Sequence, residues 1–425
     1  MLLSIAGKFG LPTRHLDCPN AFTLAPIEYK SGDDPFVIYP PANRPQYDSD
    51  GDRIVYICCR QLYGFKGAPR AFHDFLIKVL RAADFSQSAV EPCLLYKRLA
   101  DGGFLWTFVY VDDLLLVASS TKALNSELNN LHKRIKLKDL GEVKKYLGVD
   151  ISRNADKSFT LSQRRSLVEI LELAGMENCK PVTTPLETGV LDSKEQAVLR
   201  EDRATLYRSL VGKLMYIATN TRPDILVATA TLSKYLREPQ DRHWSSLQHL
   251  LAYIRGSLDT ALILGRHKYN RLTVFSDADW GRDQERKSRS GSTGFLYGLI
   301  SWSTQLDAVS LSTAESELYG LVHAAQDAIS LQYMINDLRS TFNNLPSLPP
   351  CVVGDNQASL QMAVHNTQSH QLRHVDIRYR FLHQKHTEGK LEFMYTPTST
   401  NFADIMTKIL PRDAHARNRK SIMMS

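Results

Sequence analysis

The sequence has few cysteines and no long apolar run. No stretch reaches the ~18 consecutive apolar residues of a membrane-spanning helix, and residues 1–10 lack the apolar segment of a signal peptide. The six cysteines include no Cys-x-x-C pair and no Cys/His spacing of a zinc site. We therefore expect reduced thiols and an intracellular protein that does not span a membrane.

Glycine and proline are too scarce for a fibrous or low-complexity chain, at 22 and 18 of 425 residues. Hydrophobic residues make up 43% and charged residues 23%, which is typical of a globular protein. At roughly 150 residues per domain, this length predicts two or three folded units. The net charge of +7 is compatible with a polyanionic partner but does not require one.

Two acids interrupt an apolar segment in the first third of the chain. Residues 105–118 form two β-type runs separated only by Asp112 and Asp113, which predicts a hairpin with both acids at its tip. A stripe of apolar residues at helical spacing over 71–80 predicts a helix packed on this sheet. Adjacent carboxylates in a turn are usually just solvated. A metal site would need a third carboxylate, for which Asp17 is the candidate.

The rest of the chain changes from loop to helix and then to a mixed pattern. Residues 181–205 predict a linker or loop, and residues 207–260 predict a mainly helical region. The last third alternates strands with helices, which indicates a mixed α/β domain. Its predicted strands lie at 272–276, 294–302, 308–311, 351–353 and 391–395.

Residues 110–113 (Y-V-D-D) resemble the Tyr-x-Asp-Asp signature of reverse transcriptases, specifically those of Ty1/copia-type retrotransposons. Four other segments resemble motifs of the same family, in the same order, within residues 1 to about 150. They are 16–22 (L-D-C-P-N-A-F), 62–72 (L-Y-G-F-K-G-A-P-R-A-F), 138–141 (K-D-L-G) and 146–148 (Y-L-G). The resemblance implies an RNA-directed DNA polymerase.

This resemblance implies a site for two Mg²⁺ (or Mn²⁺) ions. Its ligands would be Asp17, Asp112 and Asp113. One ion would lower the pKa of the primer 3′-hydroxyl, and the other would bridge the incoming triphosphate. Tyr110 would line the primer terminus, although such a residue alone is equally typical of a core aromatic. Lys66 and Arg70 would lie beside the template and the incoming nucleotide; alone, they are typical of solvated charges at a helix start.

Acids also follow the predicted strands and occur in the predicted helices of the last third. Four segments over about 268–410 resemble the ribonuclease H pattern of the same family. They are 276–280 (S-D-A-D-W), 313–319 (T-A-E-S-E-L-Y), 355–357 (D-N-Q) and 403–408 (A-D-I-M-T-K). Hydrolysis of an RNA strand uses one metal ion to activate water and another to stabilise the leaving 3′-oxygen. The acids expected to hold these two ions are Asp277, Glu317, Asp355 and Asp404.

Two glutamates compete for one place in this set. Glu315 and Glu317 lie two residues apart on a predicted helix, so they cannot share a face and one must be a bystander. Ala324, seven residues after Glu317, lies on its face and would let that face approach the sheet. This spacing favours Glu317. Asp279 is expected to be exposed unless the strand continues past Asp277.

Histidines near the end of the chain raise zinc as an alternative metal. They are His365, His370, His374, His383 and His386. The cluster lacks paired cysteines and a compact Cys/His spacing, which disfavours a zinc site. Residues 374–379 (H-V-D-I-R-Y) resemble the family segment H-I-D-I-R-Y, for which nucleic-acid contact or helix packing is the expectation.

Together, these resemblances imply a mixed α/β (α+β) chain with a palm sheet, thumb-like helices and a C-terminal ribonuclease H-like domain. The expected domains are a reverse transcriptase palm over 1–160, a thumb-like and connecting helical region over 161–265, a ribonuclease H-like domain over 266–411 and a basic tail over 412–425. The expected partners are an RNA template, an RNA–DNA hybrid, a DNA primer and dNTPs. The resemblance places the protein in a cytoplasmic particle or the nucleus, and the sequence indicates no oligomeric state.

The chain departs from the family pattern before Asp17. Family members carry a fingers subdomain there, whose basic residues grip the incoming triphosphate, whereas only sixteen residues precede Asp17 in this chain. We therefore expect little or no polymerisation, because positioning supplies much of phosphoryl-transfer catalysis. Missing protease and integrase signatures indicate a C-terminal fragment of a larger polyprotein. The alternative is a decayed element that binds nucleic acid or serves as a scaffold without turnover.

Overall fold

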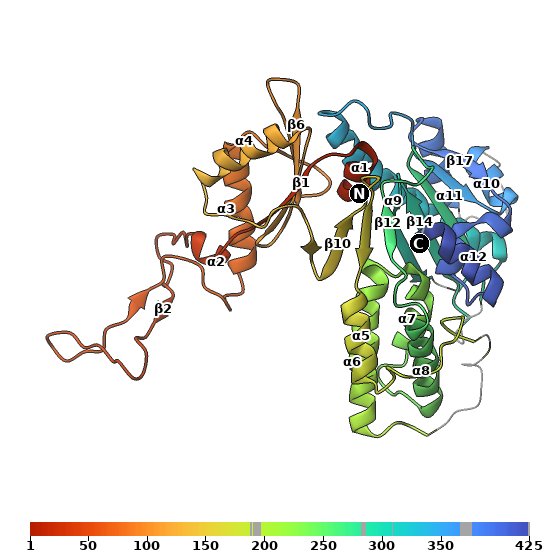
Figure 1. Cartoon of the computed structure of the whole chain (residues 1–425), viewed down its shortest axis with the longest axis horizontal. Coiled ribbons are helices and arrows are strands. Elements are labelled where there is room, and N and C mark those ends of the chain that lie inside the picture. Colours follow the sequence, from red (N-terminus) through yellow and green to blue (C-terminus); the bar gives the residue numbers. More distant parts are fainter. Residues whose placement is uncertain (188, 190–196, 282–285, 308, 366–375, 424–425) are drawn as a thin grey trace. The chain divides into compact units, whose positions relative to one another are not determined.

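A computed structural model, shown in Figure 1, describes residues 1–187, 189, 197–281, 286–307, 309–365 and 376–423. The chain divides into two compact units: Pro12–Val143, here called the small unit, and Met1–Leu11 with Lys144–Ser425, the large unit. Among the described residues, no helix has the length and hydrophobicity needed to cross a bilayer. The division after Val143 differs from the domain limits expected above, which stay predictions.

The small unit is built on a six-stranded sheet with the strand order β4-β5-β6-β7-β1-β8. Its strands are β1 (Thr13–Asp17), β4 (Ser86–Gln87), β5 (Leu94–Arg98), β6 (Phe104–Tyr110), β7 (Asp113–Ala118) and β8 (Lys138–Asp139). The helices α3 (Ala68–Ala82) and α4 (Thr121–His132) place Phe72 and Leu128 in one core with Leu105 of the sheet. The helix predicted over 71–80 is therefore confirmed, and its apolar stripe faces this core.

The predicted hairpin with two acids at its tip is confirmed. β6 and β7 pair antiparallel with Tyr110 opposite Asp113, so Val111 and Asp112 form a two-residue turn. Val111 has a φ of 53°, in the left-handed region that a β-branched residue rarely adopts. The pairing of β6 with β7 holds Val111 in this conformation, so a strained residue lies next to the two acids.

A long excursion leaves the sheet between β1 and α3 (Figure 1). It contains α2 (Ala21–Leu24) and two short strands, β2 (Val37–Ile38) and β3 (Tyr56–Ile57), which pair as a separate two-stranded ribbon. Phe36 and Tyr39 of this ribbon region are exposed. A two-stranded ribbon buries too little surface to be stable by itself.

The large unit begins with helix α1 (Leu2–Phe9), which packs against strands of a four-stranded sheet. This sheet has the order β12-β11-β10-β9, with β9 (Lys145–Tyr146), β10 (Val149–Arg153), β11 (Phe159–Ser162) and β12 (Leu262–Leu264). A Cβ added at Gly7 of α1 would lie 3.0 Å from the Cα of Gly265. The helix can approach the end of β12 this closely because neither glycine has a side chain.

The helical region predicted over 207–260 is confirmed. It is held by a buried ion pair, in which Arg222 donates two hydrogen bonds of 2.8 Å to the carboxylate of Asp224. The Tyr253 hydroxyl donates a third hydrogen bond of 2.7 Å to the same carboxylate. The elements of the region are α6 (Glu201–Asn220), η2 (Pro223–Ile225), α7 (Leu226–Ser233) and α8 (Asp241–Arg255), and α5 (Arg164–Leu173) precedes it in the chain.

A five-stranded mixed sheet forms the rest of the large unit, with the order β15-β14-β13-β16-β17. The first three strands are antiparallel, and β16 and β17 run parallel to β13. Helix α9 (Thr313–Arg339) packs across β13 and β14. The strands are β13 (Thr273–Asp279), β14 (Arg289–Phe295), β15 (Leu299–Leu306), β16 (Cys351–Gly354) and β17 (Glu392–Tyr395). The remaining elements are α10 (Gln357–Val364), α11 (Asp376–Thr387), η3 (Thr398–Thr400), η4 (Phe402–Met406) and α12 (Arg412–Met423).

Two strand predictions in this unit are wrong. The single strand expected over 294–302 is a hairpin, because the chain reverses between β14 and β15 with Tyr297 at a φ of 55°. Of the strand expected over 308–311, residue 308 lies outside the described residues and residues 309–311 form no strand. The segment expected as a basic tail forms helix α12, whose His415 and Ile422 are buried.

Candidate functional site

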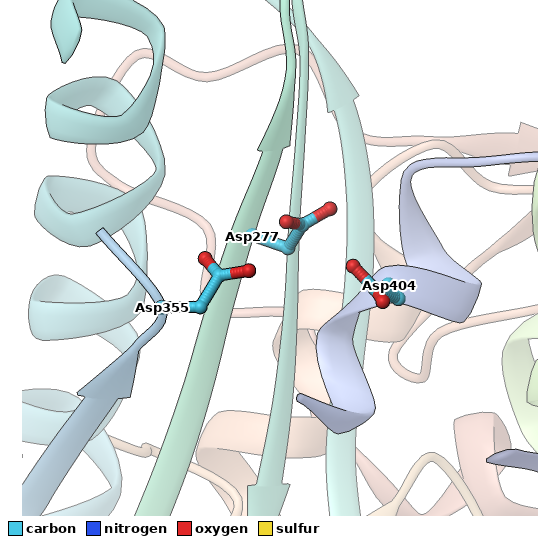
Figure 2. A group of neighbouring side chains, drawn as sticks. All are labelled: Asp277, Asp355 and Asp404. Atoms are coloured by element: carbon cyan, nitrogen blue, oxygen red, sulfur yellow. The ribbon is translucent and has the colours of Figure 1, made fainter. Parts of the chain in front are cut away.

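Three aspartates converge at one edge of the five-stranded sheet (Figure 2). Asp277 lies within β13, Asp355 directly follows β16, and Asp404 lies in η4. One carboxylate oxygen from each lies within 4.8 Å of the other two. Because β13 and β16 are parallel neighbours, their C-terminal ends meet at one edge and bring together acids that are far apart in the sequence.

Glu317 joins these aspartates from helix α9. The helix approaches β13 closely at Gly320, where an added Cβ would lie 3.0 Å from the Ser276 Oγ and 3.1 Å from the Asp277 carbonyl oxygen. Burial raises the pKa of Glu317 to about 9, and the negative charges of Asp277 and Asp355 add to this rise. A carboxyl group with such neighbours stays protonated at neutral pH unless cations enter the site.

Glu315, two residues earlier, has different partners. Its carboxylate accepts hydrogen bonds of 2.6 Å from the Leu311 backbone N–H and from the Tyr319 hydroxyl. The backbone N–H of Glu315 donates to the side chain of Ser312, the N-cap of α9. The contacts of Glu315 are therefore those of a residue that holds the start of the helix, whereas Glu317 is the glutamate whose pKa the charges of Asp277, Asp355 and Asp404 raise.

The aspartates are held by hydrogen-bonding neighbours. The Thr407 hydroxyl donates to Asp277, which is fully buried. The Thr398 hydroxyl donates to Asp355 over 2.7 Å. Burial, followed by the charge of Asp277, raises the pKa of Asp404 to about 6. Burial and the mutual repulsion of the acids thus oppose full ionisation of the cluster when no divalent cation is bound.

Sequence reasoning missed three residues that shape this site. The Lys408 ammonium lies 3.0 Å from Asp277 and 2.8 Å from Asp404. Gly291 pairs with Asp277 in the sheet, and a Cβ added there would lie 2.6 Å from the Met406 Cβ, so only glycine lets η4 come this close. Asn401 donates a hydrogen bond of 2.9 Å to the Ser276 carbonyl oxygen. Lys408 could have been found from its place four residues after Asp404, within the segment 403–408 that resembles the family motif.

The acids expected in the small unit come near one another without forming the same arrangement. Asp17 pairs with Asp113 across β1 and β7, and the Cys18 N–H donates a hydrogen bond of 2.8 Å to the Asp112 carbonyl oxygen. Burial raises the pKa of Asp17, and the charges of Asp112 and Asp113 raise it further. Asp113 also lies 2.7 Å from His15 Nε2. Within the described ranges, three ligand atoms lie within 4.8 Å of one another at Asp277, Asp355 and Asp404. The three aspartates of the small unit do not meet this condition.

The other residues expected at nucleic acid or nucleotide lie on the surface of the small unit. Tyr110 is 51% exposed at the end of β6. Lys66 is exposed just before α3, and Arg70 is exposed in its first turn, 4.0 Å from Asp74. They are accessible to a ligand, and their expected roles stay predictions.

Two of the histidines considered for zinc, His383 and His386, contact backbone carbonyl oxygens. His383 Nδ1 lies 3.0 Å from the Val364 carbonyl oxygen, and His386 Nδ1 lies 3.1 Å from that of Leu391. His370 and His374 lie outside the described residues. The contacts of His383 and His386 are those of helix packing.

Comparison with known proteins identifies the family. The family described as reverse transcriptase (RNA-dependent DNA polymerase) matches residues 1–188. The Pol polyprotein of transposon TNT 1-94 from Nicotiana tabacum is 29% identical over 97% of this chain and 31% of its own length. That of transposon RE2 from Arabidopsis thaliana is 30% identical over 97% of this chain and 28% of its own length. A transposon Ty5-1 protein of Saccharomyces cerevisiae is 30% identical over 57% of this chain and 79% of its own length.

These matches define a retroelement protein with reverse transcriptase homology. The chain belongs to the Ty1/copia-type retrotransposon Pol polyproteins, and the predicted resemblance is confirmed. It spans less than a third of the length of the TNT 1-94 and RE2 polyproteins. The predicted fold class is also confirmed as a mixed α/β chain, with a first sheet covered by helices, a helical region and a second, mixed sheet near the C-terminal end.

Solved structures show a partial likeness. A foamy viral protease–reverse transcriptase in complex with an RNA/DNA hybrid has a TM-score of 0.49 at 13% identity, over 91% of this chain and 44% of that chain. The ribonuclease H1 of Halobacterium salinarum has a TM-score of 0.25 at 15% identity, over 32% of this chain and 94% of that chain.

Proposed function

We propose that the large unit hydrolyses the RNA strand of RNA–DNA hybrids. The observation that supports this most is the convergence of Asp277, Asp355 and Asp404 within 4.8 Å of one another. Glu317 of α9 lies near enough that the charges of Asp277 and Asp355 raise its pKa. Such a set of carboxylate oxygens fits hard divalent cations, Mg²⁺ or Mn²⁺, and we propose two ions per site. When bound, these ions supply an activated water molecule and stabilise the leaving 3′-oxygen.

The chain's own residues would orient and neutralise this site. Thr407 fixes the Asp277 carboxylate, and Thr398 fixes that of Asp355, so both ligands are positioned before a cation arrives. Glu317, protonated at neutral pH in the metal-free protein, would release its proton as cations bind. Water attack on phosphorus with departure of the 3′-oxygen leaves a 5′-phosphate and a 3′-hydroxyl on the products.

The proposed partner of this unit is an RNA–DNA hybrid. The positive net charge of the chain favours a polyanion. The foamy viral protease–reverse transcriptase described above is itself in complex with an RNA/DNA hybrid. A cytoplasmic particle or the nucleus stays the predicted location.

The test is cleavage of an end-labelled RNA–DNA hybrid by the full chain. We expect cleavage with Mg²⁺, none with EDTA, and none of a DNA duplex of the same sequence. Asp355→Asn, purified in parallel, should cleave at least about 100-fold more slowly because one metal ligand is lost. Equal background rates for both proteins would contradict the proposal and favour binding without turnover.

Nucleotide addition by the small unit is a second candidate function. It is favoured by the direct pairing of Asp17 with Asp113 next to Asp112 at the hairpin tip. DNA primer, RNA template and dNTPs would be its substrates. We expect little primer extension by this chain, with little change in Asp113→Asn, because the three carboxylates do not share one ion-sized site. Template-dependent extension that Asp113→Asn abolishes would show that the palm is active.

A further inference from the structure

Lys408 occupies the side of the acid cluster between Asp277 and Asp404. Its ammonium lies 3.0 Å from both carboxylate oxygens of Asp277 and 2.8 Å from Oδ1 of Asp404. The Lys408 side chain is 22% exposed, whereas that of Asp277 is 1% exposed, so the pair is largely removed from water. Lys408 lies just past the end of η4, where its backbone N–H donates a hydrogen bond of 3.0 Å to the Asp404 carbonyl oxygen.

A buried carboxylate needs a positive partner, because an unpaired charge in the interior is strongly unfavourable. Asp277 receives one hydrogen bond from the neutral Thr407 hydroxyl, and the ammonium of Lys408 supplies the positive charge. The same ammonium also neutralises Asp404. Lys408 therefore provides the metal-free cluster with its cation.

This position is the one that a divalent ion would use. An Mg²⁺ ion binds carboxylate oxygens at about 2.0–2.1 Å, so an ion that bridges Asp277 and Asp404 must enter the space beside the oxygens that Lys408 now contacts. The ammonium and the ion would compete for the same carboxylate oxygens. Resting on the proposed function, we propose that Lys408 is a built-in counter-ion, which holds the acid cluster together before metal binding and is displaced when a divalent ion bridges Asp277 and Asp404.

Displacement has a thermodynamic consequence that a merely structural lysine lacks. If Lys408 leaves its partners when metal binds, its removal destabilises the metal-free protein much more than the metal-loaded protein. Unfolding and metal binding form one thermodynamic cycle. The difference between the two losses of stability, without and with metal, must therefore equal the gain in metal-binding free energy of the variant. A lysine that stays paired in both states would cost the same stability in both.

The experiment is thermal unfolding of the full chain in EDTA and in saturating Mg²⁺, with Mg²⁺ titrations by calorimetry. We expect Lys408→Met to lower the unfolding temperature by about 4 °C or more in EDTA and by about 1 °C or less with Mg²⁺. Its Mg²⁺ affinity should rise about tenfold. Lys408→Arg keeps the charge and should retain most of the metal-free stability. Lys390→Met is the control, because Lys390 pairs with Glu388 at 2.9 Å on the surface.

Two results would overturn the proposal. An equal loss of stability for Lys408→Met with and without Mg²⁺ would show that Lys408 stays in place, and no loss in EDTA would show that it is not the counter-ion. Hybrid cleavage by the wild-type chain would then leave the proposed function standing. Absence of Mg²⁺ binding by both the wild type and Lys408→Met would overturn the displacement together with the proposed two-ion chemistry.

Discussion

Replacing Glu317 by glutamine is expected to abolish hybrid cleavage while making the metal-free protein more stable. The loss of a carboxylate facing the proposed metal site should slow cleavage at least about 100-fold. Without metal, burial and then Asp277 and Asp355 raise the pKa of Glu317 to about 9. An acid whose pKa is raised by folding contributes stability at a pH below its unfolded pKa. This contribution is lost as the pH rises from the unfolded pKa to the folded pKa.

The stability part of this prediction is measured in EDTA at pH 8. Glutamine cannot ionise, so Glu317→Gln should be more stable than the wild type by about 3–5 kcal/mol in a urea titration. At pH 4, where both side chains are neutral, the two proteins should have similar stability. A Glu317→Gln protein that is less stable than the wild type at pH 8 would contradict the placement of Glu317 among the acids.

Glu315→Gln is the matched control on the same helix, and its expected effects are opposite. Glu315 accepts hydrogen bonds from the Leu311 N–H and the Tyr319 hydroxyl. Loss of its charge should lower the free energy of unfolding by about 1–3 kcal/mol. Cleavage by the folded protein should stay close to that of the wild type. Similar behaviour of the two variants would mean that they share one role.

Replacing Asp224 by alanine should destabilise the large unit by about 3–5 kcal/mol, because it leaves a buried guanidinium without its partner. The Arg222 and Asp224 side chains are 1% and 0% exposed and are joined by two hydrogen bonds. Urea unfolding measures the change. Asp259→Ala is the control, since Asp259 pairs with Arg164 at 2.8 Å in an exposed position and should change stability by less than about 1 kcal/mol.

The buried Arg222–Asp224 pair should also make the free energy of unfolding fall as the pH is lowered in the acid range. Burial alone would raise the pKa of Asp224, but Arg222 and Tyr253 hold it well below its usual range. A carboxylate with a depressed pKa contributes stability above its unfolded pKa of about 4 that is lost as the pH falls through the lower folded value. Asp224→Asn should therefore flatten the loss of stability below about pH 4, and an unchanged profile would contradict this contribution.

Local patterns in the sequence were enough to predict the main elements. The apolar β-type runs on either side of Asp112 and Asp113 predicted their hairpin, and the helical stripe over 71–80 predicted α3. The strand error over 294–302 arose at a tight reversal in which Tyr297 takes the positive φ and the neighbouring Gly298 does not. Turn chemistry of that kind is set by the paired strands and not by the local residues.

The sequence by itself determined the family, the order of the elements and a short list of acids, because motif spacing and periodicity are properties of neighbouring residues. Only the tertiary structure decided that Asp277, Asp355 and Asp404 share one place, since their separation depends on which strands pair. It also decided the close approach at Gly291 and the ion pairs of Lys408. Distances between residues far apart in the chain are set by packing of the whole unit, which no local pattern contains.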